Sequence, residues 1–410
     1  MRTFEEYIAE GGQFGHLNNI WDVGNLTTEK LVDIIKKSIN LDFGKADLKL
    51  DSVAMSFTVR EDGKVVGSRN KTQTKGFGAN GLDVNAMAAK FKGHKLEFAY
   101  TWTIRNLQEA INQLSEKQKK KIFNNGRNWM AVEVLGWGAS NIIDYGGVKE
   151  LTLLGTIEHD EDGNKVGHVN KENAKILDGM LRQKSAEQQS KFVIKNVPTV
   201  TFNQIKGANK LKAELIGKVK SIMRGSKNIT HYKSNKMSAV ISKQIKDPEL
   251  KKILINRWVH MDKSFNIRNI YKQWPEHKAW IQKTDKMVPN LMKEFLLPLE
   301  KVFLKLGAEV VAALNVFKAK DPSKTAMKLR KDFDSAVSKI KASGEEKLMK
   351  KLALELNRLE AAGGRDAIAP EEGVTFFIKD GKGDKTLVKL TGTFAPVNQI
   401  IGLLFNIQAR

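Results

Sequence analysis

The chain has 410 residues, no cysteine and a formal net charge of +23, from 69 Lys and Arg against 46 Asp and Glu. The missing cysteines exclude disulfides, thiolate metal ligands and a cysteine nucleophile, and no apolar run reaches the roughly 18 residues of a membrane span, so we expect a cytoplasmic protein without membrane contact. The excess positive charge attracts polyanions, which makes nucleic acid the expected partner, the alternative being a lysine-rich solvated surface.

The first part of the chain predicts a helical lead-in followed by short strands. Residues 1–45 contain the run "LTTEKLVDIIKKSINL", in which Thr28 is predicted to cap a helix with apolar residues at helical spacing. From Lys45 to about Val166, apolar residues mostly alternate with polar ones, and turns such as "EDGK" and "DEDGN" separate the runs. One helix, "IRNLQEAINQLSEKQKKKIF", interrupts these strands.

Residues from about 170 to 364 have mostly helical periodicity. Two starts, "DPELKKILINRW" and "DPSKTAMKLRKDF", place proline at the first helical position, and "SGEEKLMKKLALELNRLEAAGG" places Ser343 and Glu346 in capping-box spacing. The run "EGVTFFIKDGKGDKTLVKL" then predicts a hairpin. The predicted fold is α+β, with an antiparallel-sheet domain (1–165 and 366–410) split by a large all-helical insertion (166–365).

Lys49 is the candidate for covalent chemistry. It lies in an alternating run between apolar Leu48 and Leu50. A lysine that is partly desolvated or close to other cations has a lowered pKa, and only the neutral amine is a nucleophile. The alternative is an edge-strand lysine that protects a sheet from pairing with another chain.

The segment "KLDS", from Lys49 to Ser52, resembles the K-x-D-G signature of the covalent nucleotidyltransferases, the superfamily of DNA ligases, RNA ligases and capping enzymes. In that family the lysine attacks the α-phosphate of ATP or GTP and releases pyrophosphate. The resemblance implies a split antiparallel-sheet, ligase-like fold, ATP and Mg²⁺ as cofactors, Lys49 as nucleophile and Asp51 beside the nucleotide, although Asp51 could instead cap a turn.

Further segments follow in the family's order. "GSRN" (67–70) resembles the strand after the nucleophile, so Arg69 is expected to contact the nucleotide or the acceptor end, and Arg69, Lys71 and Lys75 are candidates for nucleic-acid binding. The segment 129–164, which begins "WMAVEVLGWG", resembles one of phage-type RNA ligases. It places Glu133 at the position that binds the ribose hydroxyls, and Leu153 or Leu154 near that of the aromatic residue that stacks on the base, with Leu154 as the candidate.

The C-terminal hairpin supplies the last two matches. "EEGVTFF" (371–377) resembles the E-G-x-V motif, which implies that Glu372 holds the divalent metal. "LVKLTG" (387–392) resembles the K-x-K motif, which implies that Lys389 neutralises the α-phosphate. The sequence departs from the family pattern at four positions: Ser52, Ala54, Leu154 and Thr391.

Two functions therefore stay open. One is an ATP-dependent RNA or polynucleotide ligase that acts through a lysyl-AMP at Lys49, with RNA more expected than DNA and the helical insertion as the nucleic-acid grip. The other, which the four departures favour, is a catalytically silent ligase-like fold that serves as a nucleic-acid-binding or phage structural protein. The segment "TGTFAPVNQIIGLLF" (391–405) resembles the ends of proteins of large tailed phages, which implies the host cytoplasm or the virion as location and virion proteins as partners.

Overall fold

The computed structural model describes residues 17–94, 96–136, 138–185, 193–196, 200–262 and 264–408. It confirms the predicted α+β class, because helices and two mainly antiparallel sheets alternate along the chain. Within this part of the chain, no helix combines the length and the apolar character that crossing a membrane requires. Four short 3₁₀ helices connect the larger elements: η1 (Ile20–Asp22), η2 (Gly76–Gly78), η3 (Pro275–His277) and η4 (Arg365–Ala367).

Sheet A joins segments from the two ends of the chain. Its strands lie in the order β1 (Asn18–Asn19), β10 (Lys385–Thr391), β9 (Gly373–Lys379) and β2 (Ala46–Lys49). β9 and β10 form the predicted hairpin, whose turn is held by backbone N–H donors of Lys382 and Asp384 to one oxygen of Asp380. β2 pairs antiparallel with β9, so Lys49 lies opposite Gly373.

Sheet B is built from one continuous part of the chain. Its strands lie in the order β4 (Val65–Ser68), β3 (Val53–Val59), β5 (Asn128–Leu135), β6 (Glu150–His159) and β7 (Lys165–Asn170), and β8 (Val193–Asn196) pairs with β6. Alternate apolar side chains of β3 and β5 form a core with helices on one face of the sheet. The helices of this region are α3 (Lys71–Thr74), α4 (Val84–Phe91), α5 (Glu97–Asn112), α6 (Glu116–Phe123) and α7 (Lys171–Ser185). We call sheet B with these helices lobe B.

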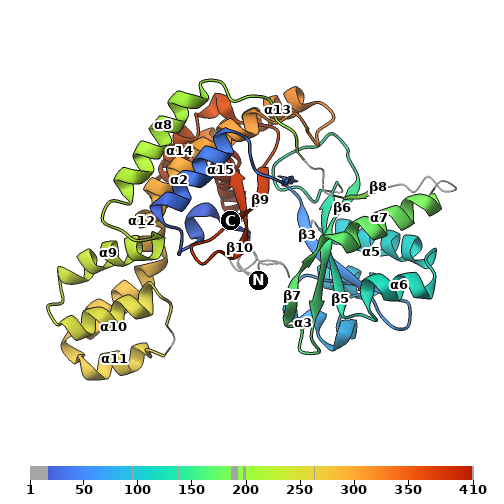
Figure 1. Ribbon diagram of the computed structural model, residues 1–410, viewed down its shortest axis with the longest axis horizontal. Helices are drawn as coiled ribbons and strands as arrows, with labels where there is room; N and C mark the ends of the chain where they lie inside the picture. Colours follow the sequence, from blue (N-terminus) through green and yellow to red (C-terminus); the bar gives the residue numbers. More distant parts are fainter. Residues whose placement is uncertain are drawn as a thin grey trace.

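The remaining helices are shared between two cores. One core unites sheet A with six helices, and we call this assembly lobe A. Its helices are α2 (Thr28–Ile39), α8 (Ala208–Ile222), α12 (Lys278–Ala312), α13 (Pro322–Ser343), α14 (Glu346–Ala361) and α15 (Phe394–Gln408). The other core joins the N-terminal half of α12 to α9 (Ile229–Ser242), α10 (Pro248–Trp258) and α11 (Ile267–Gln273). Figure 1 shows lobe A and lobe B side by side, with α9 to α11 projecting from lobe A. The strands β7 and β8 carry sheet B beyond residue 166, where the sequence predicted the helical part to begin.

Local capping differs from the sequence prediction at two helices. Thr27, and not Thr28, caps α2, because its side chain accepts from the N–H of Lys30. Ser343 is the last residue of α13 and donates to the Ile340 carbonyl, so the predicted capping box with Glu346 is wrong. The first-turn prolines of α10 and α13 are confirmed.

Two tryptophans of the segment 256–280 help to hold the helices α9 to α12 together. Trp258 and Trp274 are both buried in the core of α9 to α12, and their indole N–H groups donate to Asp285 and Asp247 respectively. These rings are therefore committed to holding the helices together.

Candidate functional site

Lys49 and Glu372 form an ion pair where the two sheets meet. Lys49 is the last residue of β2, and its neighbours Leu48 and Leu50 turn into the core of lobe A. The Nζ of Lys49 lies 3.1 Å from Oε2 of Glu372, and the two side chains are only 19% and 9% exposed. The same Nζ donates to the Leu50 carbonyl at 3.2 Å. A pair separated by 323 residues is thus brought into direct contact.

The charge environment of Lys49 differs from the expected one. Burial alone lowers the pKa of Lys49, but the carboxylates of Glu372 and Glu133 outweigh burial, and the pKa lies above its ordinary value. The expected lowered pKa is therefore corrected: the neighbours are acids and not cations, so they hold the ammonium protonated. Burial also raises the pKa of Glu372, an effect that the charge of Lys49 opposes.

Glu133 reaches the same place from lobe B. It lies on β5, opposite Ala54 of β3 and Thr152 of β6. The hydroxyl of Ser52 donates a short hydrogen bond to Oε2 of Glu133. Ser52, the departure from the family's glycine, therefore occupies an oxygen of the carboxylate that was expected to bind ribose. Leu154 is the extra residue of a β-bulge in β6 and is half-buried.

Lys389 approaches from β10, beside Thr375 of β9 and Asn19 of β1. Burial lowers the pKa of Lys389, Glu372 opposes this effect and Lys49 adds to it. The close approach of β10 also explains Gly373: a Cβ at that position would lie 2.3 Å from the Leu390 carbonyl oxygen. The structure thus gathers Lys49, Glu133, Glu372 and Lys389, as the order of the motifs predicted.

Asp51 supports a loop. Its Oδ1 accepts from the backbone N–H and the side-chain amide of Asn141, and its Oδ2 accepts from the N–H groups of Ile142 and Ile143, all within 3.1 Å. A carboxylate has about four acceptor positions, so these four donors use all of them. The side chain is fully buried. The geometry favours the turn-capping alternative for Asp51 over direct contact with a nucleotide.

The three residues expected to bind nucleic acid lie on another part of lobe B. The guanidinium of Arg69 lies over the ring of Tyr100 on α5, 5.1 Å from its centroid. Lys71 donates to the side chain of Asn164, in the turn between β6 and β7. Lys75 follows α3, next to the same turn at Gly163. Their contacts are with α5 and with this turn, whereas Lys49 pairs with Gly373 of β9 and contacts Glu372.

A buried network that the sequence did not predict lies beside the pair. Glu371 accepts from the Lys318 N–H at 2.5 Å, and the ammonium of Lys318 pairs with Glu150 of β6. The other oxygen of Glu371 is buried without a hydrogen bond. Burial raises the pKa of Glu371 to about 7, while the N–H of Lys318 acts in the opposite direction. The only sequence signal was the adjacent acids of "EEG", which directly precede β9.

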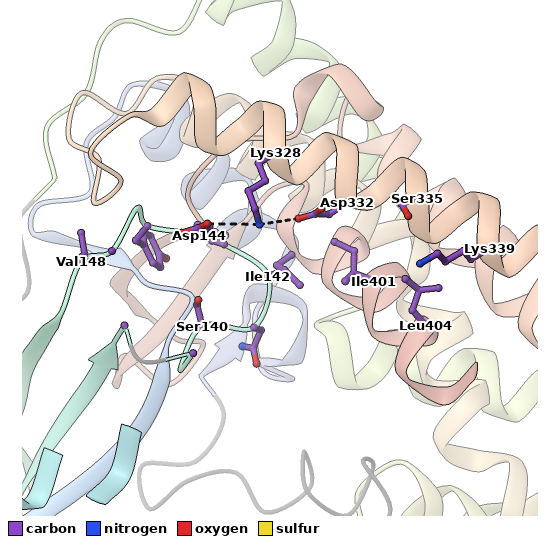
Figure 2. Close-up of a pocket in the computed structure, with 16 residues that line it drawn as sticks. Ser140, Ile142, Asp144, Val148, Lys328, Asp332, Ser335, Lys339, Ile401 and Leu404 are labelled. Atoms are coloured by element: carbon purple, nitrogen blue, oxygen red, sulfur yellow. Dashed lines mark hydrogen bonds and ion pairs between the residues drawn. The ribbon is translucent and has the colours of Figure 1, made fainter. Parts of the chain in front are cut away.

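A groove of about 590 Å³ is lined by the loop that Asp51 holds and by residues of α13 and α15. Figure 2 shows Lys328 in this groove between Asp144 and Asp332, at 3.7 and 3.3 Å. Together with Lys339, the lining has two cations and two carboxylates. This balance gives the groove no preference for a polyanion.

Among the residues that the structure describes, no group of three or more His, Asp or Glu residues could hold a metal ion. Protein-family models were searched and none matches, and searches of the curated proteins and of the solved structures also find no match.

Proposed function

We propose that the chain is a covalent nucleotidyltransferase, an ATP-dependent ligase-like enzyme acting on RNA or another polynucleotide through a lysyl-AMP at Lys49. The observation that carries the proposal is the 3.1 Å pair of Lys49 and Glu372 at the meeting of two sheets. Glu133 reaches this pair from the second sheet and Lys389 from the hairpin. These are the residues that the family resemblance assigns to nucleophile, metal, ribose and phosphate.

The chemistry requires Lys49 to lose a proton before it reacts. Its amine would then attack the α-phosphorus of ATP, the bond from that phosphorus to the bridging oxygen would break, and pyrophosphate would leave. Oε2 of Glu372 lies 3.1 Å from Nζ, within reach of the proton. The buried charge of Lys389 would stabilise the negative charge that grows on the phosphate oxygens.

Glu372 is also the residue that would hold Mg²⁺, with phosphate oxygens as further ligands, since this ion prefers a few carboxylates together with phosphates. When bound, the ion would supply further positive charge at the α-phosphate. Lys49 must lose its proton to become a nucleophile, and Glu372 is the carboxylate in contact with its ammonium.

A silent, binding-only member of the same superfamily is the second candidate. The bond from Ser52 to Glu133 favours it, because it occupies the expected ribose ligand. The raised pKa of Lys49 points the same way, because it favours the unreactive ammonium.

Incubation with ATP labelled at the α-phosphate and with Mg²⁺ separates the two candidates. We expect label that is lost in acid, is stable in base, and is absent from Lys49→Ala and from Lys49→Arg, whose guanidinium stays protonated. Glu372→Ala should weaken labelling. Lys379→Ala, which removes an exposed lysine from the end of β9, is the matched control and should label normally.

Ser52→Gly tests the departure from the family signature. Label on this variant but not on the native chain would identify a silenced enzyme. If neither protein takes label from ATP or GTP with any divalent metal, the enzyme proposal is refuted and the binding role stands in its place.

A further inference from the structure

Lys318 joins the two lobes beside the pair of Lys49 and Glu372. It lies between α12 and α13, next to Ala319, which belongs to the core of lobe A. Its ammonium forms an ion pair with Glu150, the first residue of β6 in lobe B. The side chains of Lys318 and Glu150 are only 9% and 5% exposed. The ion pair is therefore a buried link between the lobes.

On the side of lobe A, Lys318 holds the residue that precedes Glu372. Its backbone N–H donates to Oε1 of Glu371 at 2.5 Å, and Glu371 is buried. A peptide bond joins Glu371 to Glu372. The backbone of Lys318 therefore fixes the segment that carries Glu372 to Lys49.

On the side of lobe B, Glu150 leads to Glu133 through sheet B. Oε1 of Glu150 accepts from the hydroxyl of Thr152 at 3.1 Å, and it also accepts from the ammonium of Lys318. Thr152 is the register partner of Glu133 on β5. Lys318 thus stands between two acids of the candidate site, with Glu372 on one side and Glu133 on the other.

The ion pair opposes a separation of the lobes. When one partner of a buried pair is removed, the other charge loses its counter-ion, and this is strongly destabilising. Water that enters between the lobes relieves the cost, because it solvates the remaining carboxylate. The ammonium of Lys318 therefore keeps this part of the interface closed.

Lys318 is more deeply buried than two other lysines that reach across the lobes. Lys328 of α13 lies 3.7 Å from Asp144 of lobe B, and both side chains are about half-exposed. Lys171 of α7 pairs with Asp47 of β2 at 2.5 Å, and its side chain is about one-third exposed. Exposed pairs contribute little, because solvent screens their charges. Among these three links, the one through Lys318 is the best placed to set the distance between the lobes.

We propose that Lys318 is a positioning residue, which holds the two lobes at the separation that brings Glu133 close to Lys49. It acts through the carboxyl groups that it holds in each lobe. That this separation serves nucleotide transfer to Lys49 rests on the proposed function, whereas the link between the lobes does not.

Double electron–electron resonance between two spin labels measures the separation. The native chain has no cysteine, so Glu109→Cys on α5 and Lys351→Cys on α14, both at exposed positions, place one label in each lobe. We expect Lys318→Met to lengthen the mean distance and to broaden its distribution. Lys318→Arg keeps the charge and should restore the native distribution. The matched control is Lys328→Met, which removes an exposed link between the lobes and should leave the distance unchanged.

A second variant serves where Lys318→Met does not fold. Lys318→Met/Glu150→Gln removes both charges of the ion pair, so no carboxylate loses its counter-ion. This double variant should also show the longer distance, because the link is lost. A native distribution in either variant would overturn the inference. So would a broad distribution in the doubly labelled chain that keeps Lys318, because the link should hold its lobes at one separation.

The labelling experiment with ATP tests the effect on the reaction. Lys318→Met should take label on Lys49 about 100-fold more slowly, the loss that a misplacement of about 1 Å causes, and Lys318→Arg should recover the rate. An unchanged labelling rate in a variant with a longer distance would contradict the positioning role.

The spin-label distances need no ATP, so the two proposals can fail separately. A longer distance in Lys318→Met, with no label on any of the proteins, would refute the proposed function and leave the link between the lobes standing. Label on the native chain, with native distances in Lys318→Met, would do the reverse.

Discussion

Replacing Glu372 by glutamine should destabilise the protein and lower the pKa of Lys49. At 3.1 Å and an effective dielectric constant of about 20, the attraction in this pair is on the order of 5 kcal/mol. Desolvation offsets much of that in the native chain, but removing one partner leaves a buried charge alone, which costs about 3–5 kcal/mol. We therefore expect the free energy of unfolding at pH 7 to fall by about 3 kcal/mol.

The pH dependence has a definite sign. The folded-state pKa of Lys49 lies above its ordinary value of 10.5, so the pair stabilises the native chain below that pH, and this stabilisation is lost as pH rises through the folded-state pKa. In Glu372→Gln the carboxylate is gone and burial, the largest influence on this lysine, lowers the pKa. The two proteins should thus differ most near neutral pH.

Denaturant unfolding at pH 7 and NMR titration of ¹³C-methylated lysines measure the two effects. Glu346→Gln is the control, because it breaks an exposed pair with Lys350, whose side chains are 82% and 76% exposed, and should leave stability unchanged. A loss of stability no larger than in this control, or a Lys49 amine that titrates at the same pH in both proteins, would refute the reasoning.

Two further predictions concern the buried acids next to the pair. The pKa of Glu371 is raised from 4.5 to about 7, so the native chain should lose about 3 kcal/mol of stability as pH rises from 4.5 to 7. Glu371→Gln should flatten this dependence, which denaturant unfolding at several pH values measures. An unchanged dependence of stability on pH in this variant would contradict the assignment. Asp51→Asn keeps one acceptor oxygen for donors from Asn141 to Ile143, so stability should fall by about 2–3 kcal/mol and these amides should exchange hydrogen faster; native-like protection of the loop would contradict its role as a clamp.

The sequence predicted the parts of the fold that leave a local signal. Alternating apolar residues identified β3, β5, β6 and the C-terminal hairpin, and the first-turn prolines located α10 and α13. The motif order also predicted the approach of Lys49 to Glu372, although nothing local links residues so far apart.

What the sequence did not predict depends on contacts between distant segments. The pKa of Lys49 depends on Glu372, which directly precedes β9, and on Glu133 of β5, and a pattern along β2 contains no information about them. The hydrogen bonds that Asp51 accepts come from a loop 90 residues further along the chain. The position of the first turn of α9 after η1 depends on backbone bonds to Gly24 and Leu26, which leave no trace in periodicity.

The connection of the two lobes sets an order of events during synthesis. Lobe B is formed by one continuous segment, so its core can close once residue 196 has left the ribosome. Sheet A pairs Ala46 with Phe376, so β2 must wait for a segment about 330 residues further along the chain before its partner exists. A nascent chain therefore passes through a stage with one finished lobe and an open strand edge, a target for chaperones or for another chain. Lys49 can meet Glu372 only after residue 372 has been synthesised, so shorter nascent chains cannot assemble the pair.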